Sequence, residues 1–435
     1  MSRTLAQWLA YQEQVNVRSI ELGLDRVRAV WQRMGAPPPA LRVITVGGTN
    51  GKGSTVAILE AMLKAAGLRV GCFTSPHLID YNERVRIEGS NADDASLVAS
   101  FERIETARGA GTDDAISLTY FEFGTLAALD LFAHADLDVA VLEVGLGGRL
   151  DAVNIIDADV AIVTTVDLDH MDWLGPDRDS IGREKAGIAR RGRPVIVGDM
   201  DPPPGLLDAL NAIGARIERA GIDFTVDRLA DGWRWQHRDG LAMLLPDPAL
   251  AAPVQYLNAA AAIAALRVLF NDDVPAPGQL FAAASLGLTS VRVPARLQSL
   301  GGDPQVIVDV GHNPQAARAL AQWLDSQPAC RVQAIYGALS DKDVAGVMAA
   351  LGARIGHWHL AGLDGDTPRG LSAAHLASML EKTLPQASFA MHADVVTALA
   401  AARADALAGE RILAFGSFFV ASAMLAANTD ESGDE

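Results

Sequence analysis

Short apolar runs alternate with longer, helix-patterned stretches along most of the chain. In the first part, the runs at 41–46, 69–73, 138–144, 159–166 and 194–197 are almost wholly apolar, which is typical of strands that are buried on both faces. The stretches between them are long enough to be helices. This alternation predicts an α/β fold with a doubly wound, mostly parallel sheet.

Helical periodicity is predicted over most of the intervening segments. Residues 1–35 place their apolar positions near one helix face, and Pro37 stops that helix before the first strand. Ser180 is a suitable N-cap for a helix that ends before Gly192. The other helices are expected at 56–66, 93–109, 119–135 and 255–270, with one more ending at 281–288.

The pattern changes twice after residue 200. Up to residue 250, a polar/apolar alternation around Trp233 and Trp235 suggests an antiparallel addition. Near Val293 the helical pattern breaks and a second α/β alternation begins. Its strands are expected at 305–310, 331–336, 357–361 and 410–415, and its helices at 314–327, 341–353, 371–384, 392–406 and 417–426.

These changes predict two domains. The first, 1–292, would carry the glycine-rich loop described below, and the second, 293–427, would be a smaller Rossmann-like α/β domain. The last residues, 428–435, are acidic and poor in apolar side chains, so we expect a disordered tail.

Composition and charge narrow the class of protein. Half of the residues are apolar and the net charge is −17, so a nucleic-acid partner, which requires a basic face, is not expected. No apolar run reaches the roughly 18 residues of a membrane span, and the N-terminus lacks a signal-peptide pattern. Cys72 and Cys330 have no metal-ligand spacing, so we expect reduced thiols and a cytoplasmic location.

A glycine-rich loop connects the run at 41–46 to the helix that follows it. Its glycines allow main-chain N–H groups to approach phosphate oxygens, and the following helix directs its positive end at the same anion. Lys52 can reach terminal phosphates, and Ser54 or Thr55 can hold a metal ion. Gly53 separates the lysine from the serine, which departs from the usual motif. A plain glycine turn with a surface lysine is the alternative, but the strand and helix on either side favour a phosphate loop.

Ser75, Glu143 and His170 each lie at the end of a predicted strand. Because the carboxyl ends of parallel strands share one edge of the sheet, we expect these side chains to converge with Lys52. A carboxylate is costly in an apolar strand unless it is paired or bound to a metal. Ser75 and Glu143 fit the few protein ligands that Mg²⁺ takes beside a nucleotide. The alternatives are helix capping by Glu143 and a structural role for His170.

Two other groups carry weaker signals. Lys185, next to Glu184, is by composition a surface lysine in an ion pair. His357 and His359 form a His-x-His pair that alternation places on one face of a strand. The sequence shows no third ligand near them, so we interpret this pair as structural.

Asp309, His312 and Asn313 follow the first strand of the second domain. The group lies where a ligand is expected in an open α/β sheet. Asn313 precedes Pro314 at a helix start, so helix N-capping is the alternative interpretation.

Taken in order, these stretches resemble the folate branch of the Mur ligase family, the bacterial dihydrofolate synthase/folylpolyglutamate synthase. The resemblance covers about residues 15–425. The motifs are GTNGKGS at 48–54, TSPHL at 74–78, NERVRI at 82–87, LTYFEF at 118–123, LEVGLGGRLDAVN at 142–154, LDHMDWLG at 168–175, REKAGI at 183–188, DVGHNP at 309–314 and GSF at 416–418.

The resemblance implies an ATP-dependent ligase that forms an amide between L-glutamate and dihydropteroate and adds further glutamates to reduced folates through an acyl phosphate. ATP and two Mg²⁺ ions are the implied cofactors, with K⁺ as a further cation to consider, and the chain is expected to be a monomer. A polyglutamylase alone, another Mur-type amino-acid ligase and a P-loop kinase are the rival interpretations.

Matched residue by residue, the resemblance also implies roles for individual side chains. Lys52 would hold the β- and γ-phosphates, Ser75 and Glu143 one Mg²⁺, and His170 a second. Lys185 lies where the family carries a carbamylated lysine, which replaces a cation by an anion facing the metal. The positions matched to ATP contacts are Gly48, Thr49, Asn50, Gly51, Gly53, Ser54, Asn258, Arg296, Asp309 and His312, and those matched to the pterin substrate are Arg84, Thr119, Phe121 and Asp151.

One departure from the family concerns the residue before Arg296. The family often has Pro-Gly-Arg where this chain has Pro294-Ala295-Arg296. We expect the arginine contact to persist and the segment to be stiffer.

Overall fold

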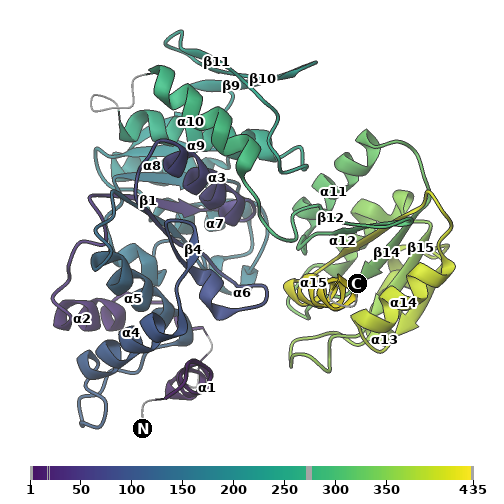
Figure 1. The fold of residues 1–435 in the computed structure, drawn as a ribbon, viewed down its shortest axis with the longest axis horizontal. Coiled ribbons are helices and arrows are strands. Elements are labelled where there is room, and N and C mark those ends of the chain that lie inside the picture. The colour runs from purple at the N-terminus through teal and green to yellow at the C-terminus, as the bar shows by residue number, and fades with distance from the viewer. Residues whose placement is uncertain (1–2, 17, 19, 271–276, 433–435) are drawn as a thin grey trace. The chain divides into compact units, whose positions relative to one another are not determined.

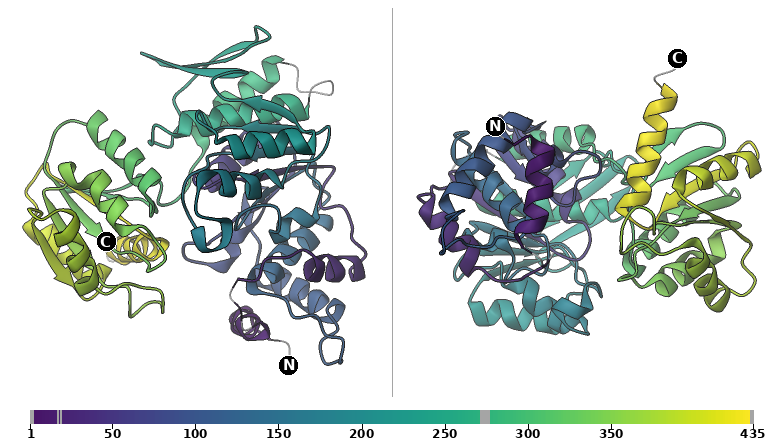
Figure 2. Two further views of the ribbon diagram at one scale, coloured as in Figure 1. Left: turned by 180° about the vertical axis from the view of Figure 1, so that it is seen from behind. Right: turned by 90° about the horizontal axis from the view of Figure 1, so that it is seen from below.

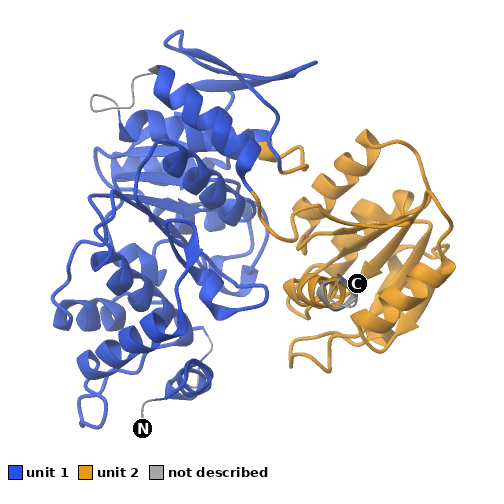
Figure 3. Ribbon diagram, in the orientation of Figure 1, with its two compact units in different colours: residues 1–249, 256–291 blue, residues 250–255, 292–435 orange. Residues whose placement is uncertain are grey.

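The computed structural model describes residues 3–16, 18, 20–270 and 277–432. The chain divides into two compact units, residues 1–249 with 256–291, and residues 250–255 with 292–435 (Figure 3). The boundary after Val291 lies close to the break predicted near Val293. Among the described residues, no helix is both long enough and apolar enough to cross a membrane.

An eight-stranded sheet with the order β4-β3-β2-β5-β1-β6-β7-β8 forms the centre of the first unit (Figure 1). The six strands from β2 to β8 in this order are parallel to one another, and β3 and β4 are antiparallel additions at one edge. The prediction of a mostly parallel sheet is therefore confirmed. The strands are β1 (Arg42–Gly47), β2 (Val70–Phe73), β3 (Val85–Ile87), β4 (Ser90–Asn91), β5 (Val139–Glu143), β6 (Val160–Val163), β7 (Pro194–Val197) and β8 (Arg216–Arg219).

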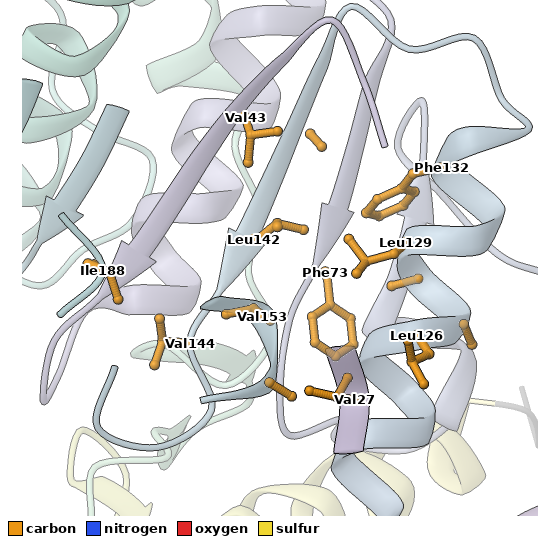
Figure 4. Packing of buried hydrophobic residues seen from close by; sticks show 14 of the residues in the cluster. Val27, Val43, Phe73, Leu126, Leu129, Phe132, Leu142, Val144, Val153 and Ile188 are labelled. Carbon is orange, nitrogen blue, oxygen red and sulfur yellow. The ribbon is translucent and has the colours of Figure 1, made fainter. Parts of the chain in front are cut away.

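Helices cover both faces of this sheet. On one face, alternate strand residues such as Phe73 and Leu142 pack against Leu126, Leu129 and Phe132 of one helix (Figure 4). The other face receives the helix that follows β1. The helices are α1 (Leu5–Val15), α2 (Asp25–Arg33), α3 (Lys52–Ala65), α4 (Asp94–Ala107), α5 (Tyr120–Ala133), α6 (Met171–Leu174), α7 (Arg178–Ala186), α8 (Pro204–Ile213), α9 (Gln255–Leu269) and α10 (Pro277–Ser290), with short 3₁₀ turns η1 (Tyr81–Arg84) and η2 (Ala152–Ile155).

The irregular region after residue 200 contains the expected antiparallel addition. Strands β9 (Phe224–Leu229), β10 (Gly232–His237) and β11 (Ala242–Leu245) form a three-stranded antiparallel sheet. Trp233 and Trp235 are fully buried beneath it, and Trp235 Nε1 donates to the carbonyl of Ala260 in α9 at 3.2 Å. The tryptophans therefore fasten this small sheet to the body of the first unit.

Figure 2 shows the second unit in green to yellow. It is built on a six-stranded sheet with the order β12-β13-β17-β14-β15-β16, in which only β12 is antiparallel. Helices again separate the parallel strands along the sequence, as the alternation predicts. The strands are β12 (Gln298–Gly301), β13 (Gln305–Val308), β14 (Val332–Tyr336), β15 (His357–Ala361), β16 (Phe389–His392) and β17 (Arg411–Phe415); the helices are α11 (Pro314–Ser326), α12 (Val344–Leu351), α13 (Ala373–Thr383), α14 (Val395–Asp405) and α15 (Phe418–Ser432), with the 3₁₀ turn η3 (Gly352–Arg354).

Several local predictions are wrong. The single helix expected over 1–35 is two helices, α1 and α2. Ser180 is not the N-cap of α7, because Asp177 caps that helix and Ser180 is its N3 partner in a capping box. The part of the predicted tail at 428–432 is helical, since α15 continues to Ser432, and the remaining residues 433–435 lie outside the described residues.

Candidate active site

The phosphate loop lies between β1 and the first turn of α3. Gly51, the N-cap of α3, has φ +88°, and a Cβ there would lie 2.7 Å from Asn258 Oδ1. Gly48 has φ +146°, and a Cβ there would collide with the Thr164 hydroxyl. Both glycines are therefore required by conformation and by space, and Asn258 of α9, matched to an ATP contact, is placed directly against the loop.

Hydrogen bonds from the end of β6 hold the loop in place. Thr164 Oγ1 donates to the Asn50 carbonyl at 2.6 Å, and the Asn50 amide donates to Thr165 Oγ1 at 3.1 Å. The Thr49 amide donates to the Thr165 carbonyl at 2.8 Å, and the Thr49 hydroxyl to the Asp167 carbonyl at 3.1 Å. The loop is thus fixed by two threonines that the sequence analysis did not single out.

Lys52 turns back over this loop. Its ammonium group donates to the carbonyls of Gly48 at 3.1 Å and Thr49 at 3.3 Å. Ser54 is buried in the first turn of α3, with 2% of its surface exposed. A cation, a helix N-terminus and exposed glycine backbone at one place are what a nucleotide phosphate requires.

Glu143 and Ser75 meet at the same edge of the sheet. In the parallel register Val46 lies beside Glu143, so the end of β5 adjoins the end of β1. The Ser75 amide donates to Glu143 Oε2 at 3.2 Å, and only 4% of Glu143 is exposed. Arg86, which bonds Glu60, is close enough to interact electrostatically with Glu143. The predicted convergence of these two residues is observed, and their oxygen donors suit Mg²⁺.

Lys185 is buried rather than on the surface, with 3% exposed. Burial, together with the positive charge of Lys52, lowers the pKa of Lys185 to about 7, although Asp169 and Asp151 oppose the shift. The surface interpretation from composition is therefore wrong. The glycines of the loop after β5 allow this placement, because a Cβ at Gly148 would lie 2.9 Å from the Glu184 carbonyl and 3.2 Å from the Lys185 Cα.

Asp151 is the buried carboxylate that faces the two lysines. Its oxygens accept the amides of Leu146 at 2.8 Å and Val153 at 3.1 Å. Burial raises the pKa of Asp151 to about 6, while these backbone donors and Lys52 act in the opposite direction. The buried Lys185 and Asp151 and the partly buried Lys52 therefore form one group of interacting charges.

His170 lies on the segment after β6, at the start of α6. It has a left-handed backbone with φ +50°, and its side chain is about one-third exposed. Its Nε2 is 3.8 Å from Asp169 Oδ1, and Asp169 also interacts with Lys185. An imidazole beside a carboxylate in this position can hold a metal ion or a phosphate.

The residues matched to the pterin substrate gather around the start of α5. Thr119 caps α5 in a capping box with Glu122. The Phe121 ring covers Gly145, where a Cβ would lie 2.5 Å from it, and contacts Phe73. Arg84 donates to His77 Nδ1 at 2.8 Å, and its guanidinium lies 5.5 Å from the Tyr120 ring centre. These aromatic and basic groups adjoin the loop that carries Asp151.

The residues of the second unit form a cluster of their own. Asp309 is partly buried, and its two oxygens accept the amides of Leu297 at 2.9 Å and Gly311 at 2.7 Å. Burial raises the pKa of Asp309, while Arg296 and His312 oppose the shift. Asn313 caps α11, so the capping interpretation of that residue is confirmed. The predicted Arg296, Asp309 and His312 are thus together.

Models of two Mur ligase domains match the chain. The Mur ligase middle domain matches residues 46–228, and the Mur ligase glutamate ligase domain matches residues 295–418. The chain is 45% identical to the dihydrofolate synthase/folylpolyglutamate synthase of Escherichia coli (strain K12) over 95% of this chain and 93% of that protein. The chain belongs to the dihydrofolate synthase/folylpolyglutamate synthase family of Mur ligases.

Solved structures of this family have the same fold. E. coli FolC in complex with DHPP and ADP superposes with a TM-score of 0.91 at 43% identity, covering 99% of each chain. A bifunctional folylpolyglutamate synthase/dihydrofolate synthase with Mn, AMPPNP and L-glutamate bound superposes with a TM-score of 0.87 at 44% identity, covering 98% of each chain. Family membership therefore extends over both units.

Sequence reasoning missed some members of the site. Arg86 lies within the quoted motif NERVRI, so its position could have been marked, whereas Asp169 is predicted as a flank of His170 in a cluster that could hold a cation. Thr164 and Thr165 end an apolar strand and resemble ordinary strand residues. Only the contact between β6 and the phosphate loop shows that they fix the loop.

Proposed function

We propose that this protein is an ATP-dependent ligase that joins L-glutamate to dihydropteroate and adds further glutamates to reduced folates. The observation that carries the proposal is the buried Lys185 at the edge of the sheet that also presents the phosphate loop with Lys52. Burying a lysine beside a second lysine costs folding free energy unless anions are present to balance the charge. Such an arrangement is typical of a functional site.

The chain's own residues supply positioning and charge. In the reaction the γ-phosphoryl group of ATP moves to a substrate carboxylate oxygen, which releases ADP and gives an acyl phosphate. The glutamate amine then forms the C–N bond, loses a proton and displaces phosphate. Lys52 and the loop amides hold the β- and γ-phosphates, and His170 faces the transferred group.

Metal and ATP binding are assigned to residues that fit them chemically. Glu143 and Ser75 offer oxygen donors for one Mg²⁺, and His170 with Lys185 in its carbamylated form would hold a second, with K⁺ as a further candidate cation. Bound Mg²⁺ neutralises charge on the phosphates during transfer. We assign nucleotide contacts to Asn258 of α9 in the first unit, and, on the resemblance alone, to Arg296, Asp309 and His312 in the second.

Lys185 is suited to carbamylation by its environment. At a pKa of about 7 a large fraction of the amine is neutral at physiological pH, and the neutral amine is the nucleophile. The neutral amine would form an N–C bond with CO₂ and release one proton, which gives a carbamate anion. Starting from the ammonium form, two protons are released in all, one on deprotonation of the amine and one on formation of the carbamate. That anion is compatible with Lys52 next to it.

The pterin-binding proposal rests on Arg84, Thr119, Phe121 and Asp151. Phe121 offers a flat apolar face beside Gly145, and Asp151 offers a carboxylate for ring nitrogens. These features favour the bifunctional enzyme over a polyglutamylase alone. The assay measures phosphate release with ATP, Mg²⁺ and L-glutamate, with dihydropteroate and tetrahydrofolate supplied separately. Release with both acceptors is expected; release with tetrahydrofolate alone would leave only the polyglutamylase.

Lys185→Ala tests the site in the same assay. We expect a loss of at least about 100-fold in turnover, because the metal-facing anion is removed. Lys382→Ala, an exposed lysine on α13, is the matched control and should keep full activity. Near-normal turnover of Lys185→Ala would contradict the carbamate role. Incubation of the wild type with ¹³C-bicarbonate should give a carbamate carbon signal that this variant lacks.

A further inference from the structure

Three histidines of the second sheet and an aspartate of a neighbouring helix lie together, and none of them is assigned a role above. His357 and His359 are on β15, His392 ends β16, and Asp405 ends α14. One ligand atom from each of His357, His359 and Asp405 lies within 4.8 Å of the other two. His392 Nε2 is 3.1 Å from His359 Nδ1. The third ligand that the sequence did not reveal is thus supplied by α14.

A hydrogen-bond chain fixes the proton on His359. The Glu410 carboxylate can only accept, so Gln333 must direct its Nε2 at Glu410 Oε2, at 3.1 Å. The Gln333 Oε1 then faces His359 Nε2 at 2.8 Å, and this nitrogen must carry the proton. His359 Nδ1 therefore directs a lone pair toward His392. A hydrogen bond from the other ring nitrogen is what orients histidines that bind metals.

His357 has a nitrogen that the protein does not satisfy. Its Nδ1 is 2.8 Å from Ser388 Oγ, and the hydroxyl can accept from it. Its Nε2 is buried and has no hydrogen-bond partner among the residues that the structure describes. A buried polar nitrogen without a partner costs free energy, which a metal ligand bond would remove.

We propose that this cluster binds one divalent transition-metal ion of the zinc class through His357, His359 and Asp405, with His392 as the fourth ligand. Imidazole with one carboxylate suits zinc, whereas Mg²⁺ and Ca²⁺ prefer oxygen ligands only. Two nitrogens at about 2.0–2.1 Å from one tetrahedral ion are about 3.3 Å apart, close to the separation seen between His359 and His392. The ion would tie edge strand β16 to β15 and α14, which is a stabilising role.

Zinc titration of the full chain tests this proposal. Calorimetry with ZnCl₂ is run in excess Mg²⁺, so that oxygen-rich sites are occupied, and bound zinc is counted after gel filtration. We expect one tightly bound equivalent in the wild type and a higher melting temperature with zinc. His357→Gln and Asp405→Asn, at half-buried and exposed positions, should each weaken zinc binding at least about tenfold.

His375→Gln, an exposed histidine on α13, is the matched control and should bind zinc as the wild type does. Cobalt(II) provides a second readout, because a tetrahedral site with nitrogen ligands gives visible absorption that both cluster variants should lose. The absence of a tight equivalent in the wild type would overturn the proposal. Equal zinc binding by wild type, His357→Gln and Asp405→Asn would also overturn it, because the zinc would then be held elsewhere.

Discussion

Each unit has an aspartate, buried in the first and partly buried in the second, whose carboxylate accepts two backbone amides. Asp151 in the first unit accepts Leu146 and Val153, and Asp309 in the second accepts Leu297 and Gly311. Burial raises the pKa of both carboxyl groups. Both aspartates therefore accept hydrogen bonds from backbone amides in the same way, and this local geometry does not distinguish them.

The difference lies in the cations around them. Asp309 faces Arg296, whose charge is permanent, and His312. Asp151 faces Lys52 and Lys185, and the two lysines repel each other, which contributes to the low pKa of Lys185. The charges of the second unit are largely compensated by the protein itself. The positive charges of the first unit are better balanced when anionic phosphates are bound. An arrangement of this kind is typical of an active site.

The largest effect should come from removing the loop cation. Lys52→Ala leaves the β- and γ-phosphates without their lysine, so we expect kcat/KM for ATP-dependent phosphate release to fall about 10³-fold. The fold should persist, because the ammonium group bonds only loop carbonyls. Circular dichroism reports on the fold, and the phosphate assay reports on kcat/KM. A fall in kcat/KM of less than tenfold would contradict a role for Lys52 in phosphate binding.

The next effect concerns the pH dependence of stability. The pKa of Asp151 is about 6 in the folded protein, against an ordinary value of 3.8. Below about pH 4 the carboxyl is protonated and does not lower the free energy of unfolding. Above about pH 6 it is ionised, and the free energy of unfolding is lowered by the full amount. The wild type therefore loses up to about 3 kcal/mol of stability on this account as the pH rises through that window. The Asp151→Asn variant has no carboxyl to ionise, so its stability should not fall over this pH window. Urea unfolding between pH 5 and 7.5 should show that the free energy of unfolding of the variant increases relative to that of the wild type as the pH rises.

Asp309→Asn is the matched variant for that experiment. Its gain over the wild type should run in the same direction and be smaller, because Arg296 and His312 offset the burial of Asp309. A steeper pH dependence for Asp309→Asn than for Asp151→Asn would invert the comparison between the units.

A smaller effect is expected from a methyl group in the loop. Gly51→Ala must adopt φ +88° and approach Asn258 Oδ1 within 2.7 Å unless the loop shifts. We expect KM for ATP to rise about tenfold, which corresponds to about 1.4 kcal/mol of binding. Gly365→Ala, in an exposed loop of the second unit with open space around it, should leave KM unchanged. Equal values for the two variants would remove the conformational requirement at Gly51.

The smallest effect is expected from replacing an alanine by glycine in the second unit. Ala295 has φ +53°, a left-handed conformation that costs an alanine about 1–2 kcal/mol but a glycine little. After allowing for the extra freedom of glycine in the unfolded chain, Ala295→Gly should stabilise the protein by about 0.5–1 kcal/mol. Thermal unfolding should shift upward by roughly 1–3 °C. A downward shift would mean that the methyl group of Ala295 packs usefully.

The parts that periodicity could predict are those buried on both faces. The central strands of both sheets, such as β5 and β17, have apolar runs that only a covered parallel strand requires. The edge strands β8, β12 and β16 were missed because they are short and partly exposed, so their sequences carry no continuous apolar run. Asp177 was overlooked as a cap because Ser180 occupies the other half of the same capping box.

The site was predictable where the fold itself gathers side chains. Parallel strand order places Ser75, Glu143 and the phosphate loop at one edge, so their meeting follows from topology. The burial of Lys185 was not predictable from composition, because it depends on Gly148 allowing α7 to approach the loop. The partners of His359 were equally hidden, since Gln333, His392 and Asp405 come from three different elements.

The hydrogen bonds from the two threonines to the phosphate loop should affect the rates of nucleotide binding and release. Because Thr164 and Thr165 hold Asn50 through hydrogen bonds within the protein, the shape of the loop does not depend on contacts with a nucleotide. Little conformational entropy is then lost at the loop on binding, and encounter need not wait for a folding step. Departure of ADP likewise requires no melting of the loop. The two hydroxyls should therefore act on how quickly nucleotides exchange, as well as on how tightly they are held.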